Sequence, residues 1–206
     1  MALFDRLFGS RPEDRPESRL PAERQAAVDG SPSAHEAARL LRAPTALMQL
    51  SEAEALTVVS FMRPRRFKSG TTIIRQGEAT DTGYMVLVLE GEITVETLIA
   101  RRVNPVTVTV LGPGSLIGEM SLVDGAARSA SCTASSDVHC AVLTREALEA
   151  LIAEQPATAA KLMTAVAQRL AERLRDSGHK LRIYSQLVQT MQQEIDALMP
   201  TPDRRL

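Results

Sequence analysis

The sequence lacks the defining features of several protein classes. Its 206 residues include only two cysteines, Cys132 and Cys140, too few for the disulfide framework of a small secreted domain. The three histidines, His35, His139 and His179, do not have the spacing of a zinc site, so no bound metal is expected. No apolar run approaches the roughly 18 residues that a membrane-spanning helix needs, and a membrane span is therefore not predicted.

Aromatic residues are also scarce, at 3% with no tryptophan. Surfaces that bind single-stranded nucleic acid stack bases on aromatic side chains, so this scarcity argues against that function. The 24 lysines and arginines nearly balance the 25 aspartates and glutamates, which gives a formal net charge of −1. Proteins that bind DNA phosphates are usually basic, so DNA is not an expected partner. The hydrophobic content, 44%, is sufficient for a buried core.

The first 33 residues divide into a short amphipathic peptide and a proline-rich segment. Within residues 1–9, Leu3, Phe4, Leu7 and Phe8 recur at helical spacing. This pattern is typical of an anchor for a membrane surface or a partner groove, with a frayed terminus as the alternative. Residues 10–33 carry four prolines among mixed charges, and we expect an extended or disordered tether there.

Short helices and then short strands follow the tether. Residues 34–42 and 51–62 have helical spacing, and Ser51 with Glu54 forms a capping-box pattern. From residue 66, β-branched or alternating segments separated by glycine turns predict strands. These segments are residues 71–74, 84–89, 93–97, 106–111, 131–134 and 138–143. About six short strands without long helices between them predict an α+β fold, an antiparallel, jelly-roll-like β-roll flanked by helices.

A second helical region occupies the C-terminal part of the sequence. After a helix that begins at Thr144, Pro156 can occupy the first turn of a long helix that continues to residue 199. Its apolar residues alternate in steps of three and four, as in the seam of a coiled coil. The seam consists of Leu170, Leu174, Ser177, Leu181, Tyr184, Val188, Met191, Ile195 and Leu198. A single helix lying on the small roll could cover only part of this stripe.

We therefore expect a homodimer through the long C-terminal helix, with the parallel arrangement preferred. Ser177 and Gly178 weaken the seam locally, which allows a bend or a break near them. The predicted organisation is a peptide and tether over residues 1–33, a roll with its flanking helices over 34–155, a coiled-coil helix over 156–199 and a tail over 200–206.

The segment from Gly118 to Ser131 contains the residues best suited to a ligand. Gly118 allows the backbone to come close to a ligand, and the helical turn expected after it would expose N–H groups to an anion. Arg128 offers paired donors that fit a phosphate, and Glu119 offers a carboxylate that accepts hydrogen bonds from hydroxyls. A ligand with both groups would use both side chains; an ordinary ion pair that braces the loop is the alternative.

These residues resemble the phosphate-binding cassette of the cyclic-nucleotide-binding domain family. The resemblance rests on residues 118–122 and 128–130, with support at 76–78, 91–92 and 112–114, and covers about residues 50–174. It implies a β-roll that holds a 3′,5′-cyclic nucleotide, with Arg128 paired to the cyclic phosphate and Glu119 accepting from the ribose 2′-OH. Further cassette contacts are implied for Gly118, Met120, Ser121 and Ser129.

The identity of the base is less well determined by the resemblance. In the bacterial catabolite-activator relatives, the long helix supplies polar side chains to adenine, partly from the dimer mate. At the corresponding turn this sequence has Arg169, Arg173 and Leu174. Arg173 can donate to guanine or stack over either base, or it can belong to a solvated helix face beside Glu172. The expected ligand is cAMP rather than cGMP, on family frequency.

The resemblance and the composition together predict a cytoplasmic, non-enzymatic sensor. Transcriptional relatives carry a helix-turn-helix domain after the long helix, and residues 199–206 are too few for one. The expected output is a changed affinity for an unidentified protein effector. The alternatives are a docking dimer whose roll binds no nucleotide and a sensor of a cyclic dinucleotide. No catalytic Ser/His/Asp or Cys/His set is apparent, and both cysteines are expected to be small core residues.

Overall fold

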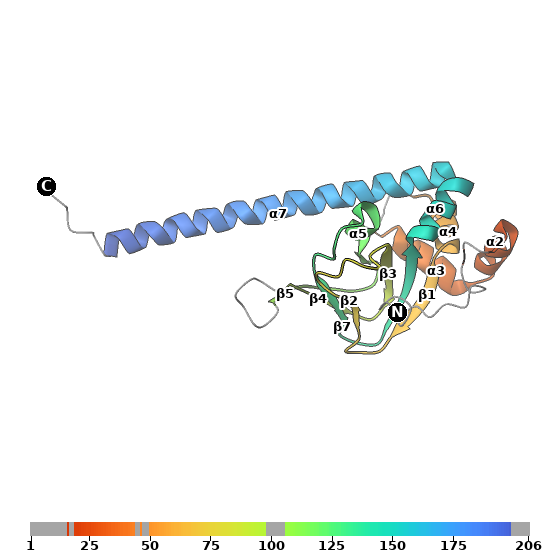
Figure 1. Ribbon diagram of the computed structural model, residues 1–206, viewed down its shortest axis with the longest axis horizontal. Helices are drawn as coiled ribbons and strands as arrows, with labels where there is room; N and C mark the ends of the chain where they lie inside the picture. Colours follow the sequence, from red (N-terminus) through yellow and green to blue (C-terminus); the bar gives the residue numbers. More distant parts are fainter. Residues whose placement is uncertain (1–15, 17–18, 44–45, 47–49, 98–105, 199–206) are drawn as a thin grey trace. The chain divides into compact units, whose positions relative to one another are not determined.

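Two antiparallel β-sheets pack against each other at the centre of the fold, shown as a computed structural model in Figure 1. The structure describes residues 16, 19–43, 46, 50–97 and 106–198, and the predicted peptide over residues 1–9 lies outside them. The chain divides into two compact units, Met1–Val166 and Ala167–Leu206. Both sheets belong to the first unit.

Each sheet has four strands, with the orders β1-β8-β3-β6 and β2-β7-β4-β5. The first sheet contains β1 (Arg63–Phe67), β8 (Val138–Thr144), β3 (Tyr84–Glu90) and β6 (Leu116–Ile117). The second contains β2 (Thr72–Ile74), β7 (Ser131–Ala134), β4 (Ile93–Thr97) and β5 (Val106–Leu111). The predicted antiparallel β-roll is thereby confirmed, and β4, β5 and β7 have the predicted bounds.

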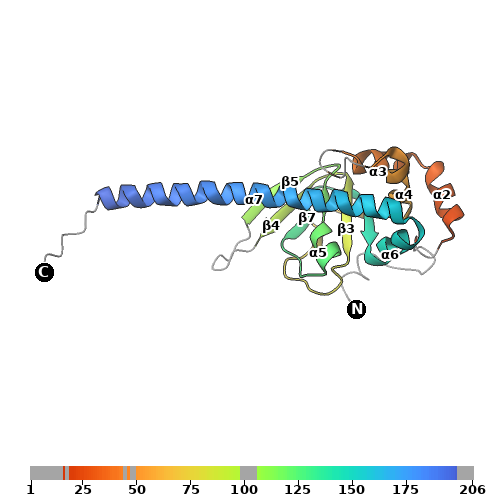
Figure 2. The same ribbon diagram turned by 90° about the horizontal axis from the view of Figure 1, so that it is seen from above.

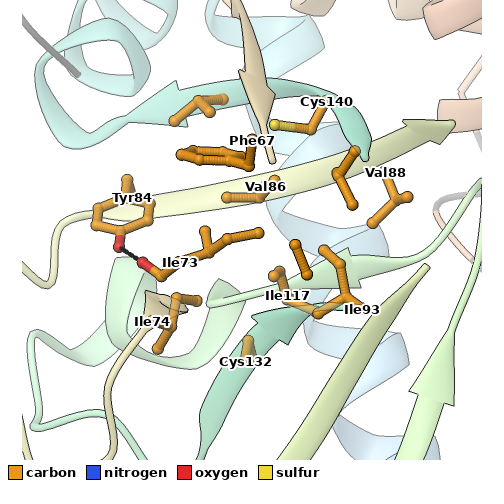
Figure 3. Packing of buried hydrophobic residues seen from close by; sticks show 13 residues of the cluster. Phe67, Ile73, Ile74, Tyr84, Val86, Val88, Ile93, Ile117, Cys132 and Cys140 are labelled. Atoms are coloured by element: carbon orange, nitrogen blue, oxygen red, sulfur yellow. Dashed lines mark hydrogen bonds between the residues drawn. The ribbon is translucent and has the colours of Figure 1, made fainter. Parts of the chain in front are cut away.

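The core of the roll consists of apolar side chains that both sheets direct toward each other (Figure 3). Val86 and Ile93, from the two sheets, are fully buried in this cluster. Cys132 and Cys140 are buried free thiols in the same cluster, which confirms the prediction that they are core residues. Burial raises the pKa of Cys140 to about 12, so this thiol stays protonated and acts as a small apolar group.

Four helices gather at one end of the roll in both views (Figures 1 and 2). They are α2 (Pro21–Asp29), α3 (Pro32–Leu41), α4 (Glu52–Ser60) and α6 (Arg145–Glu154). The predicted capping box starts α4: the Ser51 hydroxyl accepts from the Glu54 N–H at 3.3 Å, and the Glu54 carboxylate accepts from the Ser51 N–H at 2.9 Å. Thr144 caps α6 by accepting from the Ala147 N–H at 3.3 Å.

Helix α2 corrects the prediction of an extended or disordered tether before residue 33. Pro21 occupies its first turn, where the missing N–H costs no helical hydrogen bond. Arg24 is only 3% exposed; it forms an ion pair with Glu154 at the end of α6 and stacks over the Phe61 ring at 4.2 Å. These partners are 37 and 130 positions away, so local composition could not reveal the packing that orders this segment.

Helix α7 (Pro156–Leu198) begins with Pro156 in its first turn, as predicted. Its first part, in unit 1, buries the small and apolar residues Thr158, Ala159, Leu162, Ala165 and Val166. It continues through Ser177 and Gly178 as one helix, so the break that the sequence allows at these residues does not occur. Within the parts of the chain that the structure describes, no helix combines the length and the apolar character that a bilayer crossing requires.

Candidate functional site

The candidate site begins at the turn between β6 and the short helix α5 (Glu119–Asp124). Gly118 makes this turn with a left-handed backbone, φ +79°. A Cβ atom at this position would lie 2.7 Å from Nη1 of Arg128 and 2.9 Å from the carbonyl oxygen of Tyr84. Glycine is therefore required by both the backbone conformation and the close approach of these two groups.

Arg128 lies against this turn and is 3% exposed. Its Nη1 donates to the carbonyl oxygens of Tyr84 and Gly118, each at 3.1 Å, and its Nη2 donates to the Tyr84 carbonyl at 3.1 Å. The sequence placed Gly118 and Arg128 in one site, and the structure brings them into direct contact. The contact joins the end of β6, the start of β3 and the segment before β7.

The guanidinium of Arg128 also stacks on an aromatic ring. Its Cζ lies 4.2 Å from the centroid of the Tyr84 ring. Burial lowers the pKa of Arg128 from its usual value, and burial raises the pKa of Tyr84 to about 12. The arginine is nevertheless charged at neutral pH, because a guanidinium does not lose its proton in that range. The tyrosine hydroxyl is protonated and donates to the Ile73 carbonyl at 2.9 Å.

Arg128 keeps a net positive charge in this environment. Carbonyl oxygens and a ring face are neutral partners, and they satisfy donors without supplying a counter-charge. Within the ranges that the structure describes, no carboxylate lies at ion-pair distance from Arg128. The predicted alternative, an ion pair with Glu119 that braces the loop, is therefore not observed. Glu78 acts on Arg128 only through a longer-range electrostatic interaction, so the buried guanidinium would still attract an anion that comes into contact with it.

Glu119 is the first residue of α5 and directly follows Gly118, whose carbonyl accepts from Arg128. Glu119 is 1% exposed, and carboxylates are rarely buried to this extent. An ionised carboxylate accepts hydrogen bonds and donates none, so it fits a ligand hydroxyl. The structure thus places a buried acceptor next to the turn that Arg128 contacts.

The other predicted cassette residues fall into two groups. Met120 and Ser129 are exposed and touch each other, the Ser129 hydroxyl lying 3.9 Å from the Met120 sulfur. Ser121 is buried, and its carbonyl oxygen accepts from Nη2 of Arg145 at 3.1 Å. Arg173 is an exposed residue of the second unit and belongs to α7.

Two residues of this region were not identified in the sequence, Tyr84 and Arg145. Tyr84 begins an apolar run and was included only as part of a predicted strand. Arg145 is the first residue of α6; its backbone N–H donates to the Gly83 carbonyl at 2.7 Å, and its side chain reaches Ser121 in α5. It therefore connects α5 and α6, which are separated by two strands in the sequence. No local pattern marks either contact.

Comparison with known proteins gives matches in sequence. The profile of the cyclic nucleotide-binding domain family matches residues 64–155. The chain is 36% identical over 124 residues to the cyclic AMP receptor protein of Thermus thermophilus. This alignment covers 60% of this chain and 56% of that protein. The chain is 30% identical over 112 residues to a CRP-like cAMP-activated global transcriptional regulator of Mycobacterium tuberculosis, with 53% and 47% covered. The chain spans about half the length of these curated relatives.

The fold also matches a solved structure. The crystal structure of a cyclic nucleotide-binding domain from Methylobacillus flagellatus aligns with a TM-score of 0.64 at 30% identity, covering 73% of this chain and 83% of that one. The residues matched by the family profile include Tyr84, Gly118, Glu119, Arg128 and Arg145. Helices α2, α3, α4 and α7 lie outside them. Within the described residues, no group of His, Cys, Asp and Glu side chains could hold a metal ion.

Proposed function

The chain belongs to the cyclic nucleotide-binding domain family through residues 64–155, and on this premise we propose that it is a regulatory sensor of a 3′,5′-cyclic nucleotide. The observation that carries this proposal is the state of Arg128, a buried guanidinium whose hydrogen-bond and stacking partners are carbonyl oxygens and an aromatic ring, with no carboxylate at ion-pair distance among the described residues. A cyclic phosphate would supply a negative charge in direct contact with Arg128. The paired N–H donors of Arg128 match the oxygens of a phosphate in geometry.

In this proposal Glu119 accepts a hydrogen bond from the ribose 2′-OH. Its position directly after Gly118 and its acceptor-only carboxylate favour an interaction with a ligand hydroxyl. Gly118 lets the backbone approach the ligand, and Met120, Ser121 and Ser129 complete the cassette. The nucleotide is cAMP rather than cGMP, since the sequence relatives described above are named for cyclic AMP. Arg173 is the candidate contact to the base.

The sensor transmits binding by a change of shape and does not catalyse a reaction. Arg145 ties α5 to α6, so a movement of α5 onto the phosphate would displace the helix that leads into α7. A ligand that binds one arrangement of these helices more tightly shifts the population toward it. We propose that α7 joins two copies of the chain and that the output is an altered affinity for a protein effector. The buried free thiols are compatible with a cytoplasmic protein.

Titration calorimetry with cAMP on the wild type, Arg128→Ala and Arg66→Ala tests the phosphate contact. Arg66 is an exposed arginine of β1 and serves as the matched control. Loss of a buried charge-assisted hydrogen bond costs about 2 kcal/mol or more, so Arg128→Ala should bind about 30-fold more weakly. Arg66→Ala should bind like the wild type. Equal affinity of Arg128→Ala and the wild type would reject the proposed contact.

A melting experiment with a ligand panel separates the proposal from its alternatives. A ligand that binds only the native state raises the melting temperature. We expect cAMP to give the largest increase, with cGMP weaker and cyclic dinucleotides inactive. An increase with cyclic dinucleotides alone would identify a different ligand class, and no increase with any of them would favour a docking protein whose roll binds no nucleotide.

A further inference from the structure

Tyr84 makes three separate attachments at the start of β3 and is 3% exposed. Its backbone carbonyl accepts hydrogen bonds from both Nη1 and Nη2 of Arg128. The guanidinium of Arg128 stacks on the face of the Tyr84 ring, with its Cζ 4.2 Å from the ring centroid. The Tyr84 hydroxyl donates to the Ile73 carbonyl of β2 at 2.9 Å (Figure 3).

These attachments fix the ring on two sides. The backbone of Tyr84 pairs with Thr144 of β8 in one sheet, and the hydroxyl is anchored on the other sheet. The aromatic plane therefore bridges the two sheets and cannot turn away from Arg128 without breaking a buried hydrogen bond. Such a bond is costly to lose, because the freed hydroxyl and carbonyl would remain away from water.

The chemistry of the support matters as much as its position. A carboxylate beneath the guanidinium would hold it but would also neutralise it. An aromatic face attracts a cation through its quadrupole and carries no formal charge. The aromatic support thus holds the guanidinium in place without itself neutralising the charge that an incoming anion would meet.

We propose that Tyr84 is a positioning residue that presents Arg128 to the cyclic phosphate, holding the guanidinium on its ring face without neutralising it. This inference rests on the proposed function of the site. Tyr84 would have no direct contact with the phosphate and would act only through Arg128. The simpler interpretation is that Tyr84 is one more member of the core cluster, in which case its loss would lower stability alone.

Three substitutions distinguish the two interpretations. Tyr84→Phe keeps the ring and removes the hydroxyl anchor, whereas Tyr84→Leu keeps an apolar side chain and removes the ring. Val142→Ala, in β8 of the same core cluster, is the control for a general loss of packing. Affinity for cAMP is measured by calorimetry below the melting temperature of every variant.

A cation–π contact in a desolvated site is worth up to about 2 kcal/mol, which corresponds to a change of about 30-fold. We expect Tyr84→Leu to bind cAMP about 5- to 30-fold more weakly and Tyr84→Phe to stay within about 3-fold of the wild type. Val142→Ala should lose thermal stability and keep its affinity. In an Arg128→Ala background, Tyr84→Leu should have no further effect on affinity, because the group that it positions is absent.

A second readout needs no nucleotide. In the wild type, nitrogen-15 NMR should show slow rotation of the Arg128 guanidinium, and Tyr84→Leu should accelerate this rotation while Val142→Ala should not. Wild-type affinity for Tyr84→Leu, an equal weakening by Val142→Ala, or unchanged rotation in Tyr84→Leu would each overturn the inference. If the wild type binds no cyclic nucleotide, the proposed function fails, and the rotation measurement still decides whether Tyr84 positions Arg128.

Discussion

The unit that ends at Val166 and the helix that follows it differ in how far their apolar side chains are exposed to solvent. In the first unit, Met85, Leu87 and Leu143 are completely buried by other parts of the same chain. In the second, the residues of the predicted seam face solvent, with Leu174 74% and Leu181 69% exposed. Exposed apolar surface of this extent is uncommon in monomers and marks interaction sites. The first unit thus has an apolar core within one chain, whereas the exposed apolar stripe of the second is the basis of the proposed association.

The two units also differ in how far apart in the sequence the partners of their polar groups lie. In the first unit, buried polar groups find partners far away in the sequence, as Arg24 does with Glu154 and Arg128 with Tyr84. In the second, hydroxyls bond to the backbone one turn earlier in their own helix, for example Ser185 to the Leu181 carbonyl at 3.0 Å. The contacts of the candidate phosphate site therefore depend on the packing of the first unit, whereas these hydrogen bonds of the second unit are local to its helix.

The largest expected effect tests this division directly. Leu181→Glu combined with Val188→Glu places like charges in the predicted seam, where they would face each other in a dimer. We expect a complete change from dimer to monomer at micromolar concentration, measured by sedimentation velocity. The melting temperature of the roll and its affinity for cAMP per chain should change little.

Gln186→Glu is the matched control, because it adds a carboxylate to the same helix outside the seam. It should leave the dimer intact. A wild type that sediments as a monomer would contradict the proposed association, and a monomeric Leu181→Glu/Val188→Glu variant that no longer melts cooperatively would contradict the independence of the first unit.

The local pattern of the sequence was sufficient wherever an element is specified by its own residues. The alternation of β-branched residues predicted β4 and β5, and the Ser51 capping box predicted the start of α4. Strand β1 was not predicted, because Pro64 is a poor strand former and the segment Arg63–Phe67 contains no β-branched residue. It lies at a sheet edge, where proline is tolerated, and exists because it pairs with β8.

The candidate site shows the same limit. Gly118, Glu119 and Arg128 were predicted because they lie within eleven consecutive residues and resemble a known cassette. Tyr84 was not predicted as part of the site, since its contact with Arg128 joins positions 44 apart. A single sequence carries no pattern for such a pair. The packing of the two sheets determines it, and only the structure reveals it.

A smaller effect is expected from Arg24→Leu, which tests whether α2 is an integral part of the first unit. The substitution leaves Glu154 without its ion-pair partner and removes the cation–π contact with Phe61. Because Glu154 is 31% exposed, water compensates part of the loss, and we expect a decrease of about 1–3 kcal/mol in the free energy of unfolding. Urea denaturation followed by circular dichroism measures it.

Arg19→Leu removes an exposed arginine of the same segment and should change the free energy of unfolding by less than about 0.5 kcal/mol. The double variant Arg24→Leu/Glu154→Leu should recover part of the lost stability, since it leaves no unpaired carboxylate. An Arg24→Leu variant as stable as the wild type would show that α2 is only loosely attached, and the first unit would then begin later in the chain.

The smallest expected effect concerns the ion pair of Glu54 in α4 with Lys161, in the part of α7 that belongs to the first unit. The Lys161 ammonium, at 2.5 Å, and then the Ser51 N–H lower the pKa of Glu54 from 4.5 to about 2. The folded-state pKa is the lower one, so this pair stabilises the fold above pH 4.5, and the contribution is lost as the pH falls toward 2. Lys161→Met should therefore raise the pH midpoint of acid unfolding by about half a pH unit or less. The control, Lys180→Met, removes the same charge from the second unit and should leave the midpoint unchanged. Equal midpoints for all three proteins, measured by circular dichroism between pH 7 and 2, would mean that this part of α7 is no more firmly bound to the roll than the exposed helix beyond it.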